Sequence, residues 1–224
     1  MIFCDRFDAG GRLADRLKEY ANRPDVVVLA LPRGGVPVGA MIARELDVPL
    51  DVFVVRKIGV PGHPELAMGA IASGGVVSLN QDVLRHLPIT RSMFEEVMKH
   101  ERQELTRREH AYRDDLPPPD VLEKTVIVVD DGVATGSTMI AAIAALRELE
   151  AKEVIAVAPV IAASTFDAIR NAADKVFALD VPDEFHGVGS FYQDFSQTTD
   201  EEVRGLLGHA NNREQGTAAV PAFS

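Results

Sequence analysis

The stretch VIVVDDGVATGST, residues 126–138, decides the interpretation of this chain. Its four apolar residues end in two adjacent carboxylates, Asp130 and Asp131, and a loop of small and hydroxyl-bearing residues then leads into a helical pattern. Small residues let a backbone turn tightly, so that its N–H groups converge on an anion at a helix N-terminus. Two carboxylates would repel that anion, but they suit hydroxyl groups of the same ligand. The stretch therefore predicts a strand, a loop and a helix that bind a sugar phosphate.

Two common phosphate-binding motifs do not fit this stretch. A Walker A loop needs Gly-Lys-Ser/Thr, and this loop has no lysine. A dinucleotide fingerprint places its glycines before the acidic residue, whereas here the carboxylates come first. A purely structural role, in which Asp130 and Asp131 only end a strand and cap a helix, leaves the TGST run at 135–138 unexplained.

Short apolar runs alternate with helical patterns along the chain. The runs that predict buried strands are Asp25–Leu31, Leu50–Val55, Thr125–Val129, Glu153–Val160 and Lys175–Val181. The helical patterns are Asp8–Ala21, Val36–Leu46, Ser137–Leu149 and Ser164–Ala173. Such alternation predicts an α/β fold with a doubly wound, mainly parallel sheet.

Two segments interrupt the alternation. Residues 67–79 contain two apolar runs around Gly74-Gly75, which predicts a β-hairpin. Residues 90–115 predict one long helix with Thr90 as its N-cap, ended by the prolines at 117–119. The positive and negative charges of this segment nearly cancel, which favours a solvated helix over a nucleic-acid arm. The expected i,i+4 ion pairs are Glu95/Lys99, Glu104/Arg108 and Glu109/Arg113. Residues 209–224 are small and polar and predict a disordered tail.

Composition limits the possible functions. The 224 residues carry a net charge of −11, which argues against nucleic-acid and membrane-surface partners. The single cysteine, Cys4, excludes an internal disulfide and fits a reducing compartment. No segment approaches the roughly 20 apolar residues that span a bilayer, and the six histidines form no HExxH metal site. We expect a cytoplasmic protein with no metal ligands of its own.

The strand, the acidic pair, three variable residues and Thr-Gly-Ser-Thr resemble the signature of type I phosphoribosyltransferases, which bind 5-phosphoribosyl 1-diphosphate (PRPP). The resemblance covers about residues 25–181. It implies that Asp130 and Asp131 are catalytic residues that hold the ribose hydroxyls. It also implies a 5′-phosphate cradle made of Ala134, Thr135, Gly136, Ser137 and Thr138.

The resemblance implies a second, pyrophosphate-binding loop after the first core strand. Arg33, Gly34 and Gly35 lie there, and the Pro32–Arg33 bond corresponds to a non-proline cis peptide found in relatives. Arg56 and Lys57 close the second strand, where relatives present a basic pair to pyrophosphate. They are therefore predicted to be catalytic.

The resemblance also implies elements around the core. We expect a flexible lid at 57–79, in which His63 and Glu65 either contact the reacting groups or are solvated loop residues. A helical insertion at 80–116 and a hood at 182–195 with the N-terminal segment complete a single domain, 1–208. In the hood, the rings of Phe185, Phe191 and Tyr192 either stack on the acceptor or pack beneath the loop.

The implied reaction is transfer of the 5-phosphoribosyl group from Mg²⁺-PRPP to a nitrogenous base or similar small acceptor, with release of pyrophosphate. Mg²⁺ would arrive with PRPP, and the reaction would belong to nucleotide metabolism. A homodimer is common in the family. One alternative is a non-catalytic PRPP-sensing regulator; a weaker one is a hydrolase or phosphorylase acting on a nucleotide. PRPP-sensing regulators of this kind bind DNA or RNA through a basic domain or face, so the net charge of −11 favours the enzyme.

Overall fold

The computed structural model describes residues 1–87, 89–113 and 116–216, and its body is an α/β sandwich. The central sheet has five strands in the order β2-β1-β6-β7-β8, and every neighbouring pair is parallel. Its strands are β1 Val26–Ala30, β2 Leu50–Val52, β6 Thr125–Val129, β7 Glu153–Val160 and β8 Lys175–Asp180. The predicted mainly parallel sheet is confirmed.

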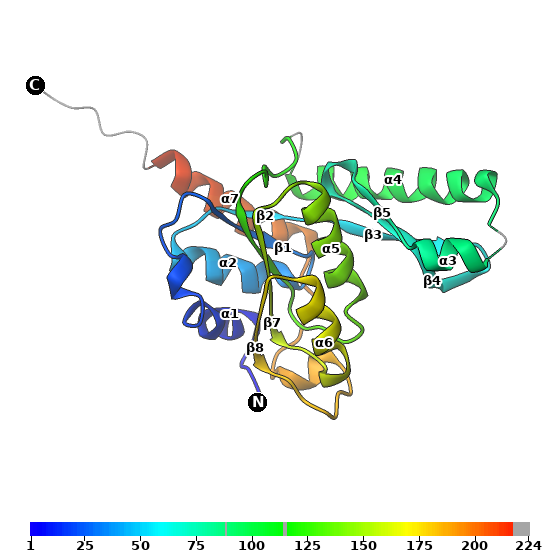
Figure 1. The fold of residues 1–224 in the computed structure, drawn as a ribbon. Helices are drawn as coiled ribbons and strands as arrows, with labels where there is room; N and C mark the ends of the chain where they lie inside the picture. The colour runs from blue at the N-terminus through cyan, green and yellow to red at the C-terminus, as the bar shows by residue number, and fades with distance from the viewer. Residues whose placement is uncertain (88, 114–115, 217–224) are drawn as a thin grey trace, which may run out of the picture.

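Helices cover both faces of this sheet (Figure 1). They are α1 Arg6–Ala14, α2 Gly35–Leu46 and α7 Asp200–Gly216 on one face, and α5 Ser137–Glu148 and α6 Ala163–Ala172 on the other. β1 and β6 are buried along their whole length, because their Val, Ile, Leu and Ala side chains enter one apolar cluster on each face. The fold is therefore doubly wound, as predicted.

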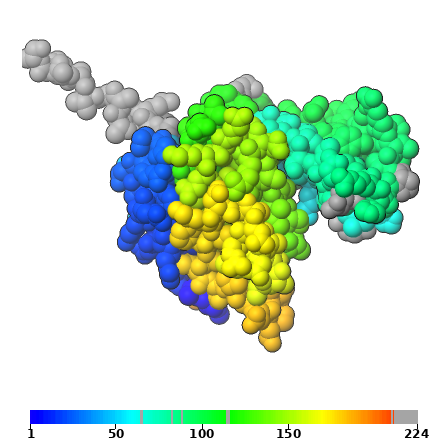
Figure 2. Space-filling model, viewed as in Figure 1, coloured from blue at the N-terminus to red at the C-terminus, as the bar shows by residue number. Residues whose placement is uncertain are grey.

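An arm, residues 55–113, projects from this body (Figures 1 and 2). It contains an antiparallel sheet of β3 Val55–Val60, β4 His63–Ala72 and β5 Val77–Leu79, followed by α3 Gln81–His86 and α4 Arg91–Arg113. Thr90 caps α4 as predicted, since its Oγ1 accepts a hydrogen bond from the Met93 N–H at 3.3 Å. The hairpin around Gly74-Gly75 is also present.

A second hairpin, formed by β3 and β4, precedes the one around Gly74-Gly75. Residues 58–67 are mostly strand, with Pro61-Gly62 as the turn, because Ile58 and Val60 are buried in the larger apolar cluster. Leu50–Val55 was expected to be one strand, but β2 ends at Val52 and β3 begins at Val55. Whether the segment moves as a lid stays a prediction.

Long-range packing changes other expectations. Arg113 does not make the expected pair with Glu109; it donates from Nε and Nη2 to Asp51 of β2, at 2.7 Å each, and so ties α4 to the body. The expected helix Asp8–Ala21 ends at Ala14, and a single 3₁₀ turn follows at Lys18–Tyr20. Glu104 and Arg108 pair as expected, at 2.9 Å.

The predicted disordered tail is wrong for residues 209–216, which belong to α7. The helix forms because Val203 and Leu207 are buried in the cluster over the sheet, with Leu206 and Ala210 packed beside them. The flanking small and polar residues obscure this apolar stripe in the sequence. Residues 217–224 lie outside the described residues. None of the described helices combines the length and apolar character needed to cross a membrane.

Candidate active site

Two loops meet at the carboxyl edge of the sheet because β1 and β6 are adjacent parallel strands. The Leu31 N–H donates to the Val129 carbonyl at 2.8 Å. A Cβ on Gly34 would lie 2.0 Å from Oδ2 of Asp131, and one on Gly35 would lie 2.6 Å from the Val129 carbonyl oxygen. Only glycine fits at these positions, so the predicted pyrophosphate loop and the acidic pair are in direct contact.

The Pro32–Arg33 peptide bond is cis, as predicted. Arg33 is 37% exposed and lies 3.7 Å from Asp200 Oδ1, at the start of α7. Its guanidinium thus stands at the mouth of the loop, where it can meet a ligand. Binding of pyrophosphate by Arg33, Gly34 and Gly35 stays a prediction.

The loop after β6 is shaped as an anion cradle. Gly136 adopts φ +72°, and a Cβ there would lie 2.5 Å from Cγ2 of Thr165. Thr165 also donates to the Ala134 carbonyl at 2.6 Å, which turns this loop carbonyl toward α6. Thr135 Oγ1 and Ser137 Oγ lie 2.8 Å apart.

The N-terminus of α5 is left open to a ligand. Gly136, its N-cap, supplies no side-chain hydrogen bond, and the first turn carries no acidic residue. Ala134, Thr135 and Thr138 are exposed. A helix N-terminus with uncapped N–H groups and nearby hydroxyls favours an anion such as phosphate. The five residues predicted to form the 5′-phosphate cradle are therefore together, and their role stays a prediction.

The acidic pair is held by a residue from a distant part of the chain. Arg6, at the start of α1, donates from Nε to Asp131 Oδ2 at 2.8 Å and from Nη1 to the Ser196 carbonyl at 2.8 Å. The Arg6 and Asp131 side chains are only 10% and 13% exposed. Asp130 turns its Oδ1 toward the Asp131 N–H, at 2.9 Å.

The electrostatics of the pair suit a ligand that brings positive charge or hydroxyl donors. Burial and then the charge of Asp131 raise the pKa of Asp130 well above its ordinary value. Burial also raises the pKa of Asp131, and the hydrogen bond and charge of Arg6 oppose that rise. Two partly desolvated carboxylates with one guanidinium bound to Asp131 can accept hydrogen bonds from hydroxyl groups of a ligand. Within the described ranges, no cluster of three His, Cys, Asp or Glu side chains could hold a metal ion.

The hood residues pack around the same point. The N-terminal segment pairs with the hood: the Phe3 N–H donates to the Phe191 carbonyl and the Gln193 N–H to the Phe3 carbonyl, both at 2.8 Å. Tyr192 is 7% exposed, with its ring centroid 5.4 Å from that of Phe3 and 5.1 Å from that of Phe195.

Tyr192 also touches the acidic pair. Its hydroxyl donates to the Asp131 carbonyl at 2.5 Å, and burial raises its pKa. Its ring is packed under the hood, and its role in acceptor binding stays a prediction. Phe185 and Phe191 lie 5.4 Å apart, centroid to centroid, and are half-buried. They remain the candidates for stacking on an acceptor.

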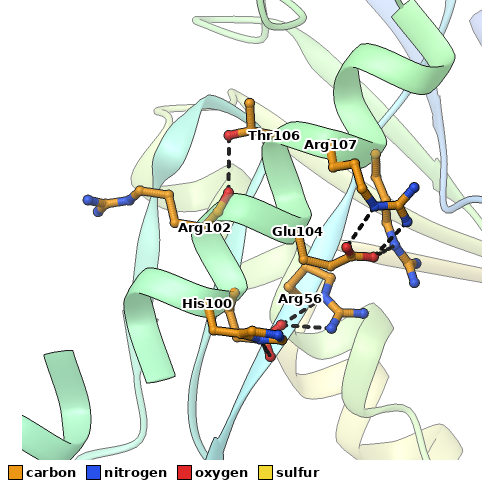
Figure 3. Close-up of polar contacts among 8 residues, drawn as sticks. Arg56, His100, Arg102, Glu104, Thr106 and Arg107 are labelled. Carbon is orange, nitrogen blue, oxygen red and sulfur yellow. Dashed lines mark hydrogen bonds and ion pairs between the residues drawn. The ribbon is translucent and has the colours of Figure 1, made fainter. Parts of the chain in front are cut away.

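The predicted basic pair lies on the arm. Arg56 donates from Nε to Glu101 of α4 at 2.8 Å (Figure 3), and its side chain therefore points to α4. Lys57, the next residue of β3, is exposed, and alternation places it on the other face of the strand. In this conformation Arg56 is engaged by a carboxylate, and a catalytic role for either residue stays a prediction.

A second charged cluster lies further along α4, where Arg107 and Arg108 both pair with Glu104. Figure 3 shows Arg107 pointing to Glu104. Hydrogen bonds from these two guanidinium groups lower the pKa of Glu104 to about 2. His63 begins β4, and the side chain of Glu65 lies outside the described residues. Their contribution to the chemistry stays a prediction.

Neither Arg6 nor the contact between Tyr192 and Asp131 was predicted from the sequence. Arg6 sits in the segment CDRFD, which has no recognisable motif. The one available signal is its place at the first turn of a helix with Asp5 as N-cap, and this does not identify a partner 125 residues away. Only the folded chain shows the pairing.

The chain is similar to known proteins along most of its length. Residues 5–67 and 65–196 match the family model described as a phosphoribosyl transferase domain. Two Mycobacterium tuberculosis proteins, named "Putative phosphoribosyl transferase Rv0571c" and "Putative phosphoribosyl transferase MT0597", are each 40% identical over 221 residues, which is 99% of this chain and 50% of theirs. The chain thus spans about half the length of these curated relatives.

A solved structure resembles the whole fold. The crystal structure of TT1426 from Thermus thermophilus superposes with a TM-score of 0.84 at 39% sequence identity. The superposition covers 92% of this chain and 98% of that one. The arrangement of body and arm therefore recurs in a protein from another organism.

Proposed function

Since the chain belongs to the phosphoribosyl transferase domain family, we propose that it binds Mg²⁺-PRPP and transfers the 5-phosphoribosyl group to a nitrogenous base. The observation that carries this proposal is the meeting of the two loops at one sheet edge. Gly34 and Asp131 are in contact there, and the open N-terminus of α5 follows the same strand as the acidic pair. One ligand with a phosphate, a ribose and a pyrophosphate would satisfy all three groups.

Each part of the site has a task in this proposal. The N–H groups and hydroxyls of residues 134–138 hold the 5′-phosphate. Carboxylate oxygens of Asp130 and Asp131 accept hydrogen bonds from the ribose hydroxyls. Backbone N–H groups of Gly34 and Gly35, with the guanidinium of Arg33, receive the pyrophosphate. Bound Mg²⁺ would neutralise charge on the pyrophosphate as it leaves.

The reaction then depends on positioning rather than on a protein nucleophile. The bond between ribose C1 and the pyrophosphate oxygen breaks, and its electron pair leaves with pyrophosphate. The acceptor nitrogen forms the new bond to C1 and releases its proton. Positive charge develops on the ribose in between, and in this proposal the carboxylates of Asp130 and Asp131 stabilise it.

A pyrophosphate-release assay tests the proposal. The full chain is mixed with Mg²⁺-PRPP and a panel of purine, pyrimidine and other nitrogenous bases, and Asp131→Asn is the matched control. We expect release with at least one base and none with the variant. PRPP binding without release on any base would favour a PRPP sensor, and the absence of PRPP binding would contradict the proposal as a whole.

A further inference from the structure

Arg6 is a buried arginine that the proposed reaction does not yet use. It is 9% exposed, and its guanidinium carbon lies 4.0 Å from the centroid of the Phe195 ring. One edge of the group contacts Asp131 and another contacts the Ser196 carbonyl. A buried guanidinium is costly unless its charge is paired and its donors are used. The buried cation of Arg6 is thus paired with one particular carboxylate, that of Asp131.

The carboxylate of Asp131 is held on several sides. Arg6 binds its Oδ2, the Gly34 backbone lies so close that a Cβ would reach Oδ2, and the Tyr192 hydroxyl holds the carbonyl of the same residue. The other charged side chain that faces it is Asp130, its neighbour in the loop after β6. These contacts fix both the rotamer and the orientation of the carboxylate.

The bond from Arg6 leaves acceptor capacity on Asp131. Only Nε binds the carboxylate, and it binds Oδ2, while Nη1 is used by Ser196. An ionised carboxylate has about four acceptor positions on its two oxygens. Arg6 fills one of these positions and the Asp130 side chain faces the carboxylate as well, so acceptor positions remain for a ligand hydroxyl while Arg6 stays bound.

We propose that Arg6 is the positioning residue for Asp131: it supplies the countercharge for this carboxylate and holds Oδ2, so that the remaining acceptor positions can meet a hydroxyl of the bound sugar. This inference rests on the proposed function and adds a residue from outside the matching sequence motif. It also links the hood to the ribose site, because the same guanidinium contacts Ser196 and Phe195.

A purely structural role would have different consequences. If Arg6 only fastened α1 to the hood, its removal would weaken all ligands together through loss of folded protein. If it positions Asp131, its removal weakens ligands that carry ribose hydroxyls and spares an anion that contacts only the α5 loop. The two roles therefore separate in a comparison of two ligands.

The test uses ribose 5-phosphate and inorganic phosphate as probes, each titrated calorimetrically into the full chain. For Arg6→Ala we expect ribose 5-phosphate affinity to fall about tenfold or more, because the unpositioned Asp131 carboxylate loses its hydrogen bond to a ribose hydroxyl. We expect phosphate affinity to stay within about twofold, since no anion contact is removed. Methylguanidinium added to Arg6→Ala should restore part of the lost affinity.

Arg12→Ala is the matched control. Arg12 lies on the same helix and pairs with Asp8 at 2.8 Å, but its side chain is 44% exposed. Both affinities should match those of the wild type. Arg6→Gln, which keeps an N–H donor without the charge, serves if Arg6→Ala does not fold, and the same selective loss is expected.

Equal loss of both ligands in the folded variants, or no loss of either, would overturn the role of Arg6. Failure of the wild type to prefer ribose 5-phosphate over phosphate would instead contradict the proposed function. The two failures are therefore distinguishable.

Discussion

Gly34→Ala is the sharpest perturbation of the contact between the two loops. The added Cβ would lie 2.0 Å from Oδ2 and 2.5 Å from Cγ of Asp131. Gly34 has φ −61° and ψ −33°, which alanine adopts freely, so the effect is steric and not conformational. Since a carbon and an oxygen approach to about 3.3 Å, the carboxylate must retreat by roughly 1 Å.

That movement breaks the bond from Arg6, which is 2.8 Å long in the wild type. The displaced carboxylate then no longer meets the ribose hydroxyl. Loss of that hydrogen bond between ligand and charged group costs about 1.5–3 kcal/mol, so we expect PRPP affinity to fall roughly 10- to 150-fold. Overpacking of this kind costs about 1–3 kcal/mol of folding stability, and for a chain of this size each kcal/mol lowers Tm by about 2–4 °C.

The assay is isothermal titration of Mg²⁺-PRPP, with a thermal melt of the same samples. Gly208→Ala is the control: it lies on α7, a Cβ there meets nothing within 4 Å, and alanine suits a helix better than glycine does. Its PRPP affinity should be unchanged and its Tm equal or slightly higher. A folded Gly34→Ala protein that binds PRPP as tightly as the wild type would refute the placement of Asp131 in the ribose site.

Three further results are expected. Because the pKa of Asp130 is raised in the folded protein, its ionisation lowers the stability of the fold as pH rises from the ordinary carboxyl range through the raised value. The Tm of Asp130→Asn should therefore exceed that of the wild type by a margin that grows with pH, while PRPP affinity falls. A constant margin from about pH 4 to 8 would contradict this. Tyr192→Phe removes the hydrogen bond to the Asp131 carbonyl and should lower Tm by about 2–4 °C, for about 1 kcal/mol, with a few-fold loss of PRPP affinity; an unchanged melt would show that the bond is unimportant. Arg113→Ala should lower the free energy of unfolding in urea by about 2–4 kcal/mol, which is less than for a fully buried ion pair because Asp51 is 24% exposed. A loss below about 0.5 kcal/mol would show that other contacts hold the arm to the body.

Features with a local cause were predictable from sequence. The strand of residues 125–129 and the loop after it follow from a continuous apolar run and small residues, and the structure shows both. The cis bond at Pro32–Arg33 came from the family resemblance. The strand and the loop depend on neighbouring residues in the chain, which a sequence displays directly.

Features caused by distant partners were not predictable. Arg113 pairs with Asp51 of the body and not with Glu109 of its own helix, and Arg56 pairs with Glu101 on the arm. Arg6 reaches Asp131 only because α1 and the hood fold over the sheet edge. Long-range ion pairs and apolar stripes among polar residues, as in α7, depend on the tertiary fold, which no local pattern encodes.

The central claim is that the acidic pair and the adjoining loops form a PRPP site, and a thermal shift with Mg²⁺-PRPP tests it most directly. At 100 times Kd, binding adds about 2.7 kcal/mol, which predicts a rise in wild-type Tm of about 5–10 °C. Asp131→Asn should show no rise, while Asp15→Asn, whose exposed carboxylate pairs with Lys18, should respond like the wild type. An equal rise in wild type and Asp131→Asn would contradict the claim.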